Sequence, residues 1–320
     1  MQRDFDLLAF GEPLMEFAEV TRDGEHLFLP GLGGDTSNVI VAAARQGART
    51  AFMGAVGDDP FGRRFLELWD REGVDRSFVR SPKGSQTGIY FISYGPDGHE
   101  FSYRRAGSAS ALVQPDDVPA ELVRRAAILH VSGISQAISA SACDAVFHAI
   151  RIAREAGTVV AYDPNLRLRL WPLDRARAIV DATARSTDLL LPGLDDARQL
   201  TGLDEPEAIC RHYLAMGPQV VALTMGKDGT MVATRERMVV IEAFPVQAVD
   251  ATGAGDVFDG SFLVRWLAGR DPFAAARYAN AAAALSTLGH GAVAPIPTRA
   301  DVQAFLAKTD RLAQMDRGRA

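Results

Sequence analysis

The sequence has only two cysteines, Cys143 and Cys210, and neither belongs to a CxxC pair. We therefore expect neither a disulfide framework nor a zinc site. Such cysteine usage is typical of a protein in the reducing cytoplasm. No run approaches the ~18 apolar residues of a membrane span, and the acids near the start argue against a signal peptide. The six histidines form no His-x₃-His pair, so a metal-hydrolase pattern is missing too.

Positive charge is not in excess. Lysines and arginines number 34 against 40 aspartates and glutamates, for a net charge of −6. A nucleic-acid partner is not expected, because such proteins usually carry a basic face. A small anionic substrate remains open, because a site needs only a few local cations. Hydrophobic residues make up 48% of the chain, which is enough for a sizeable core.

Strand-like and helix-like segments alternate along most of the chain. The strand-like runs are 5–17 (broken at Gly11-Glu12-Pro13), 50–57, 126–133, 158–163, 188–192 and 219–226. The helix-like runs are 34–48, 59–73, 139–156 and 174–185. Asp35 or Thr36 is expected to cap the first helix, and Gly47 to end it. The alternation predicts one α/β domain over residues 1–320, with a doubly wound, mainly parallel sheet flanked by helices.

The stretch 77–103 breaks this alternation. "SFVR", "TGIYFISY" and "EFSYR" are short β-rich pieces joined by turn residues such as "GPDG". They predict a small antiparallel sheet inserted into the α/β chain.

The stretch "VDATGAGDVFDG", residues 249–260, carries the strongest chemical signal. Gly253 and Gly255 let the backbone approach a ligand, and the following helix would present unpaired N–H groups to a phosphate. A glycine turn capped by Asp256, with no ligand, is the alternative. The third small residue of the dinucleotide fingerprint is missing, and Gly226-Lys227 is followed by Asp228, so no Walker A loop is present.

"DATGAGDVFDG" resembles the C-terminal signature of the ribokinase-like (PfkB) carbohydrate kinases, and "GLGGDTSNVIVAAARQGA" resembles their N-terminal di-glycine signature. The two motifs stand in the order that the family uses, and the resemblance covers nearly the whole chain. It implies a ribokinase-like fold with a small β-sheet lid from segments near 17–30 and 77–105. "GGDTSN", "YRRAGSA", "HVSGISQAIS" and "YDPNLR" look most like the members that act on 2-keto-3-deoxygluconate.

The resemblance makes Asp256 the general base for a sugar hydroxyl, with Gly253, Ala254 and Gly255 as the anion hole for the phosphoryl group. A helix start should stabilise ionised Asp256, which would then be a weak base. Asp259, three residues later, is expected to point away and to be structural.

For the sugar side, a sugar acid calls for arginine, whose planar fork binds carboxylates. Arg104 and Arg169 are expected to face solvent. The residues that the resemblance implies for substrate binding are Gly34, Asp35, Asn38, Tyr90, Tyr103, Arg105 and Arg167. Capping the helix is the alternative role for Asp35, and both roles can coexist. A tyrosine on a strand is more often a packing residue.

For ATP, "LTMGKDG" resembles the family's turn over the phosphates, and the Ala-rich stretch 278–292 resembles the adenine-side helix. The residues implied are Asn165, Arg167, Thr224, Gly226, Gly229 and Asn280. A tightly packed core helix is the plainer interpretation of the Ala-rich stretch.

The metal pattern departs from the family. Many members carry Asn-x-x-Glu where this chain has Gly193 and Asp196. Mg²⁺ would then be held mainly by ATP oxygens and water, with Asp196 acting through water. Asp250 and Thr252 are candidates for a K⁺ site, as in some relatives.

Together these expectations describe a kinase that uses ATP and Mg²⁺ to phosphorylate the terminal hydroxyl of 2-keto-3-deoxy-D-gluconate. Kinases for fructose or 2-keto-3-deoxygalactonate, and a catalytically silent sugar-sensing protein, are the alternatives. The apolar lid strand "IYFISY" predicts a homo-oligomer, a dimer or larger, formed through the lid.

Overall fold

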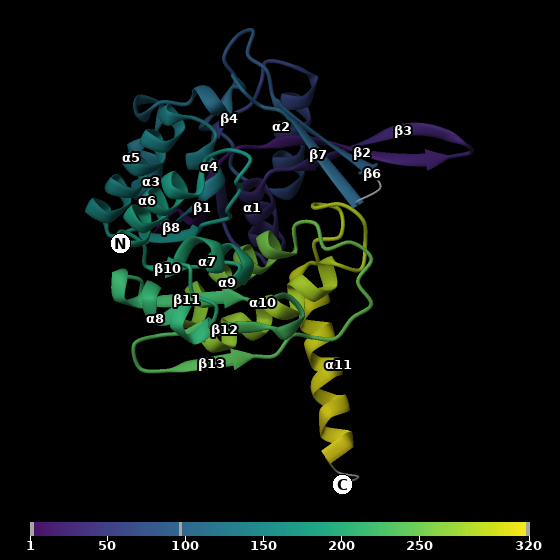
Figure 1. The fold of residues 1–320 in the computed structure, drawn as a ribbon, viewed down its shortest axis with the longest axis vertical. Coiled ribbons are helices and arrows are strands. Elements are labelled where there is room, and N and C mark those ends of the chain that lie inside the picture. The colour runs from purple at the N-terminus through teal and green to yellow at the C-terminus, as the bar shows by residue number, and fades with distance from the viewer. Residues whose placement is uncertain (1–2, 96–97, 318–320) are drawn as a thin grey trace.

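Residues 3–95 and 98–317 are described by a computed structural model, whose main feature is a nine-stranded sheet (Figure 1). Its strands are β1 (Phe5–Gly11), β4 (Thr50–Ala55), β5 (Val79–Arg80), β8 (Ala126–Ser132), β9 (Val159–Asp163), β10 (Leu189–Leu190), β11 (Val220–Thr224), β12 (Thr230–Ala233) and β13 (Met238–Ile241). Their order is β13-β12-β11-β10-β9-β8-β1-β4-β5. Strands from β11 to β5 pair in parallel, and β12 and β13 are antiparallel. The predicted doubly wound, mainly parallel sheet is confirmed.

Helices cover both faces of this sheet, and each face has its own apolar core. One face carries α1 (Asp35–Arg45), α2 (Pro60–Glu72), α9 (Ala254–Gly269), α10 (Pro272–Ser286) and α11 (Arg299–Arg317). The other carries α3 (Ala120–Arg125), α4 (Gly133–Ala137), α5 (Ala140–Ala156), α6 (Leu173–Ala184), α7 (Leu194–Thr201) and α8 (Pro206–Met216). Within the described ranges, no helix is both long and apolar enough to cross a bilayer.

Helix ends follow the local sequence at most places. Asp59 caps α2 by accepting a hydrogen bond from the Gly62 N–H, and Gly73 ends it in the left-handed region at φ 70°. The expected cap of α1 was wrong. Gly34 is the N-cap, at φ 101°, and a Cβ there would lie 2.3 Å from the Glu12 carbonyl oxygen. The close backbone crossing therefore requires glycine, and the Asp35 carboxylate, inside the first turn, accepts a 2.8 Å hydrogen bond from the Thr36 N–H.

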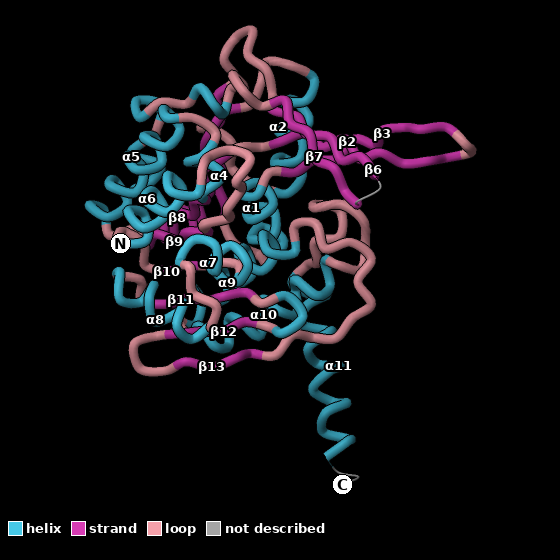
Figure 2. The backbone as a smooth tube through the Cα atoms, in the orientation of Figure 1, coloured by secondary structure: helices cyan, strands magenta, loops and turns pink. Residues whose placement is uncertain are grey.

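A second sheet, which we call the lid, projects from the body (Figure 2). Its strands are β2 (Leu14–Arg22), β3 (Glu25–Gly33), β6 (Gly88–Gly95) and β7 (Gly98–Arg104), in the order β3-β2-β6-β7. The sheet is mixed, because β2 pairs with β6 in parallel. The prediction for "SFVR" was wrong, since β5 pairs with β4 in the large sheet. The turn expected at "GPDG" contains residues 96 and 97, which lie outside the described residues.

Candidate active site

A cleft of about 790 Å³ lies at the carboxyl ends of the parallel strands and reaches the lid. It is lined from the ends of β9 and β11, from the first turns of α1 and α9, and from lid strands β6 and β7. Doubly wound sheets place their ligand sites at this edge. The cleft brings together the following predicted residues: Gly34, Asp35, Asn38, Tyr90, Tyr103, Arg105, Asn165, Arg167, Asp196, Thr224, Thr252, Gly253, Gly255 and Asp256.

Asp256 lies in the first turn of α9, and Asn38 Nδ2 donates a 2.7 Å hydrogen bond to its Oδ2. Gly253 is the N-cap at φ 76°, a conformation that favours glycine. A Cβ at Gly255 would meet no protein atom within 4 Å, so this turn leaves room for a ligand. The N–H groups in the first turn of a helix have no carbonyl partner inside that helix. In α9 the Ala254 N–H donates instead to the Ala251 carbonyl, which precedes the helix.

The expectation that the helix start keeps Asp256 strongly acidic was wrong. Burial and the negative charge of Asp35 raise the pKa of Asp256 to about 7, although the Asn38 hydrogen bond and Arg167 oppose the change. Desolvation disfavours the charged carboxylate, and here it outweighs the helix dipole. A carboxylate with a pKa near neutrality can serve as a general base at neutral pH.

The expectation that Asp259 points away from the base was also wrong. Its side chain lines the cleft, is only 3% exposed, and has an Oδ2 without a hydrogen-bond partner among the described residues. Burial raises its pKa well above the usual value, and the nearby charges of Asp163, Asp256 and Asp35 add to the effect. Because α9 turns about 100° per residue, residues three apart share a face, which brings Asp259 to the side of Asp256.

Aromatic and basic side chains from the lid form the next part of the cleft. Tyr90 and Tyr103 stack with ring centroids 5.9 Å apart, and the Arg105 guanidinium lies over the Tyr103 ring at 5.6 Å. Arg105 is buried, and its Nε has no partner within the described chain. A buried, unsatisfied donor in a cleft is a candidate for contact with a ligand.

Sequence analysis missed two carboxylates beside these residues, Glu12 and Glu16. Glu12 is buried and forms an ion pair with Arg105, while Tyr90 donates its hydroxyl hydrogen bond to Glu16. Burial raises the pKa of Glu12, and the Arg105 charge opposes this. The available signal was the run "GEPLMEF", in which two acids interrupt an otherwise buried stretch.

The loop after β9 forms the opposite wall. Asn165 adopts φ 35° and donates a 3.4 Å hydrogen bond from Nδ2 to Asp35 Oδ2. Arg167 lines the cleft with its guanidinium 3.8 Å from Asp196 Oδ2. Arg169, expected in solvent, also lines the cleft and donates to the Phe101 carbonyl of β7, so it links the body to the lid.

The residues expected on the ATP side are less concentrated. Thr224 lines the cleft. Gly226 begins the neighbouring short 3₁₀ turn Gly226–Asp228 and Gly229 follows it, and both lie outside the lining. Asn280 also lies outside the lining. Its side chain accepts from Thr230 and donates to the carbonyls of Ile241 and Glu242, which fixes α10 to the sheet.

The two candidate metal-binding aspartates, Asp250 and Asp196, accept hydrogen bonds from backbone N–H groups. Asp250 accepts backbone hydrogen bonds from Thr252 and Gly291, at 2.9 and 2.8 Å. Asp196 Oδ2 accepts from the Leu166 N–H at 2.8 Å. In the described parts of the chain, no three His, Cys, Asp or Glu side chains are grouped to hold a metal ion.

A glycine turn with room for a ligand, a buried acid in that turn and a lid beside the same cleft are features expected of a phosphotransferase. The model of the pfkB family of carbohydrate kinases matches residues 6–299. The 2-dehydro-3-deoxygluconokinase of Thermoproteus tenax is 36% identical over 305 residues, covering 92% of this chain and 93% of that protein. Fructokinase-1 of Zea mays is 34% identical over 319 residues, covering 94% and 98%.

The fold of the chain also matches that of a solved sugar kinase. The fructokinase from Vibrio cholerae O395, in a form with fructose, ADP and a calcium ion bound, is 29% identical with a TM-score of 0.86. The match covers 94% of this chain and 99% of that one. The chain belongs to the PfkB family of carbohydrate kinases, and it is a sugar kinase with a ribokinase-like fold.

Proposed function

We propose that this sugar kinase transfers the terminal phosphoryl group of ATP to the terminal hydroxyl of 2-keto-3-deoxy-D-gluconate, giving the 6-phosphate and ADP. The observation that carries the proposal is one cleft that contains Asp256 together with the guanidinium groups of Arg105 and Arg167. A sugar acid needs a cation for its carboxylate and a base at its far end. The relatives named 2-dehydro-3-deoxygluconokinase and the fructokinases have similar sequence identity to this chain, so identity does not choose between the two substrates. The choice rests on chemistry, because arginine binds a carboxylate and the sugar acid carries one.

In the proposed reaction, Asp256 accepts the proton of the sugar hydroxyl while the hydroxyl oxygen bonds to phosphorus and the bond to ADP breaks. The N–H groups of Gly253, Ala254 and Gly255 would hold the phosphoryl oxygens. The carboxylate of the sugar acid would contact Arg105 and Arg167, and its hydroxyls Gly34, Asp35, Asn38, Tyr90 and Tyr103.

ATP would lie beyond this turn, near Asn165, Arg167, Thr224, Gly226, Gly229 and Asn280. Mg²⁺ would neutralise the phosphates when bound, held mainly by ATP oxygens and water, with Asp196 acting through a water molecule. A K⁺ ion near Asp250 and Thr252 is part of the same proposal. The solved fructokinase with ADP and calcium supports a nucleotide and cation at this fold's cleft.

The lid suggests a homo-oligomer. Leu27, Phe28 and Leu29 on β3 are 39%, 46% and 54% exposed, which leaves an apolar strand surface uncovered in a single chain. A second copy of this chain would cover it. Light scattering should give at least twice the 34.4 kDa chain mass, and a concentration-independent monomer would contradict the proposal.

ADP release across a panel of sugars and sugar acids tests the proposed substrate. We expect 2-keto-3-deoxygluconate to give the highest kcat/KM, above 2-keto-3-deoxygalactonate and fructose. A higher kcat/KM with fructose would make this a fructokinase. ADP release with none of the substrates would leave a sugar-sensing protein.

A further inference from the structure

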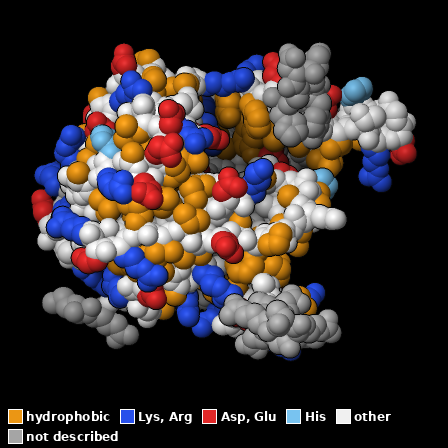
Figure 3. Space-filling view, turned by 60° about the horizontal axis from the view of Figure 1, so that its bottom comes forward, with side chains coloured by type: hydrophobic (Ala, Val, Ile, Leu, Met, Phe, Trp, Pro, Cys, Tyr) orange, Lys and Arg blue, Asp and Glu red, His pale blue; other side chains and the backbone are white. Residues whose placement is uncertain are grey.

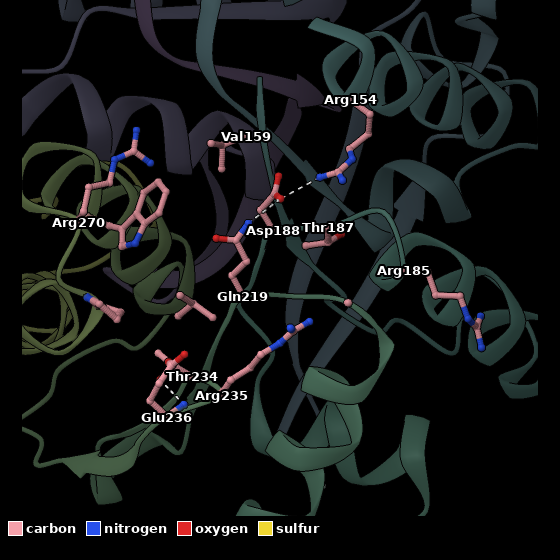
Figure 4. A pocket seen from close by; sticks show the side chains of 14 residues that line it. Arg154, Val159, Arg185, Thr187, Asp188, Gln219, Thr234, Arg235, Glu236 and Arg270 are labelled. Carbon is pink, nitrogen blue, oxygen red and sulfur yellow. Dashed lines mark hydrogen bonds and ion pairs between the residues drawn. The ribbon is translucent and has the colours of Figure 1, made fainter. Parts of the chain in front are cut away.

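A second hollow, of about 830 Å³, lies at the opposite end of the sheet from the catalytic cleft (Figure 4). It is bounded by the amino ends of β9, β10 and β11, by the turn between β12 and β13, and by the end of α9. No residue is shared between its lining and that of the catalytic cleft. It therefore needs an explanation of its own.

Arginines dominate the charge of this hollow, although the chain as a whole is acidic. Its lining has four arginines, Arg154, Arg185, Arg235 and Arg270, and two carboxylates, Asp188 and Glu236. Arg154 pairs with Asp188 at 2.8 Å, drawn as a dashed line in Figure 4. Within residues 3–95 and 98–317, Arg185, Arg235 and Arg270 have no ion-pair partner.

Asp188 does not offset these three cations. Its Oδ1 accepts from Arg154, and its Oδ2 accepts from the Val160 N–H at 2.8 Å. Gln219 Nε2 also donates to Oδ1, at 3.4 Å. The Asp188 carboxylate is therefore engaged by its neighbours. With Glu236 counted as well, the lining still has four arginines against two carboxylates, so the hollow keeps a surplus of positive charge.

Arg270 is held in place at a conformational cost. It is the C-cap of α9 at φ 54°, one of three residues other than glycine with positive φ in the described chain. Glycine or asparagine usually occupies this region, because a Cβ in it is sterically strained. The Arg270 guanidinium lies 4.2 Å from the centre of the Trp266 ring. Stacking fixes the cation at the rim of the hollow.

Arg235 is positioned by a tight turn. Thr234 Oγ1 accepts hydrogen bonds from the N–H groups of Glu236 and Arg237, at 3.2 and 3.1 Å. In Figure 4 the Arg235 side chain extends from this turn toward the middle of the hollow, and Arg185 and Arg270 stand on opposite sides. A ligand with two separated anionic groups could engage both sides, whereas a single phosphate would reach one.

We propose that this hollow is a binding site for a small phosphorylated sugar that carries a second anionic group, either a phosphate or a carboxylate. Arg235 and Arg270 bind the anionic groups, and Gln219 offers its amide oxygen and its second Nε2–H to the sugar hydroxyls. The site is separate from the catalytic cleft, and its existence does not depend on which sugar the kinase phosphorylates. Since α9 carries Asp256 at its start and Arg270 at its end, one helix connects the two sites.

Calorimetry at 0.15 M salt tests this with two probes, fructose 1,6-bisphosphate and 6-phosphogluconate, on the full chain saturated with a non-hydrolysable ATP analogue to occupy the nucleotide side of the catalytic cleft. We expect at least one probe to bind once per chain. The double variant Arg235→Ala/Arg270→Ala should bind it at least about 10-fold more weakly. Arg63→Ala/Arg64→Ala, a matched loss of two exposed charges on α2, should bind as the wild type.

Without either probe, the kcat of Arg235→Ala/Arg270→Ala should equal that of the wild type, which shows that the variant is folded. A preference between the probes identifies the second anionic group. Wild-type affinity in this double variant, equal weakening in the α2 control, or no binding of either probe would each overturn the proposal. Loss of probe binding in Arg167→Ala would overturn it as well, because the probe would then occupy the catalytic cleft.

Discussion

Asn38 donates a 2.7 Å hydrogen bond to Asp256, and this contact joins two residues that lie 218 positions apart in the chain. Asn38 is on α1 and Asp256 is on α9, and the two helices pack against each other. The bond holds the carboxylate at the cleft and favours its ionised form, while burial and Asp35 favour the protonated form. The pKa of Asp256 thus depends on burial, on Asp35 and Asn38 of α1, and on Arg167 from the loop after β9.

This arrangement predicts opposite pH shifts in two variants. A base must be ionised to accept a proton, so kcat/KM should fall as the pH drops through the pKa of Asp256, about 7. Asp35→Asn removes a like charge, which lowers that pKa and moves the acid limb to lower pH. Asn38→Ala removes the hydrogen bond and moves it to higher pH. The limb is measured as kcat/KM for the sugar at saturating ATP.

The ionisation of ATP itself is common to all three proteins, so differences among them report on Asp256. Shifts in the same direction for both variants would contradict the assignment of Asp35 and Asn38 as opposing influences.

The buried Asp259 carboxyl should make the folded protein less stable as the pH rises. Its pKa is raised in the folded protein, so the folded state retains a proton that the unfolded state loses from about pH 4 upward. The free energy of unfolding therefore falls with rising pH by up to ~1.4 kcal/mol per pH unit in this window. Asp259→Asn removes the effect, and its stability relative to wild type should be higher at pH 8 than at pH 5. Urea unfolding at both pH values measures the difference, and an equal gap at both would exclude this role.

Breaking the buried pair of Glu12 and Arg105 should destabilise the protein. Glu12→Gln leaves the Arg105 cation buried without a counter-ion, and such changes cost about 3–5 kcal/mol in the free energy of unfolding. Glu12→Gln/Arg105→Met removes both charges and should recover part of the loss. A double variant as unstable as the sum of the two single variants would show that the two charges do not interact.

Arg167→Ala should raise KM for the sugar acid by at least about 10-fold and change KM for ATP much less. The reason is that a carboxylate loses a charge-assisted hydrogen bond, which contributes ~1.5–3 kcal/mol. Initial rates with each substrate varied in turn give both constants. Equal increases in the two KM values would mean that Arg167 faces the ATP phosphates instead.

Much of the fold could be predicted because its signals are local. Alternating apolar segments indicated the parallel sheet, and Gly47 and Gly73 marked helix ends from their own neighbourhoods. The β-rich segment 77–80 was misassigned because composition does not say which sheet a two-residue strand joins. Gly34 was missed as a cap because its need for positive φ arises from Glu12, a residue distant in sequence.

The sequence indicated which residues lie in the candidate site, but it did not indicate their pKa values. Motifs located Asp256 and Arg167, but the pKa of a carboxylate depends on burial and on neighbours such as Asp35. Asp259 was expected to point away from the base, and Arg169 was expected to face solvent because a charged side chain is usually solvated. Only the packing of α9 against the sheet and of the lid against the loop after β9 shows otherwise. On the face in Figure 3, acidic and basic side chains are interspersed, as the balanced composition suggests.

The most direct test of the account is the turnover of Asp256→Asn with 2-keto-3-deoxygluconate and saturating ATP, measured by ADP release. Asparagine keeps the size of the side chain but cannot accept the hydroxyl proton. We expect kcat to fall by ~10²-fold or more while the melting temperature stays at or above that of the wild type, because a buried acid has been removed. A kcat close to the wild-type value would contradict the role of Asp256 as the base.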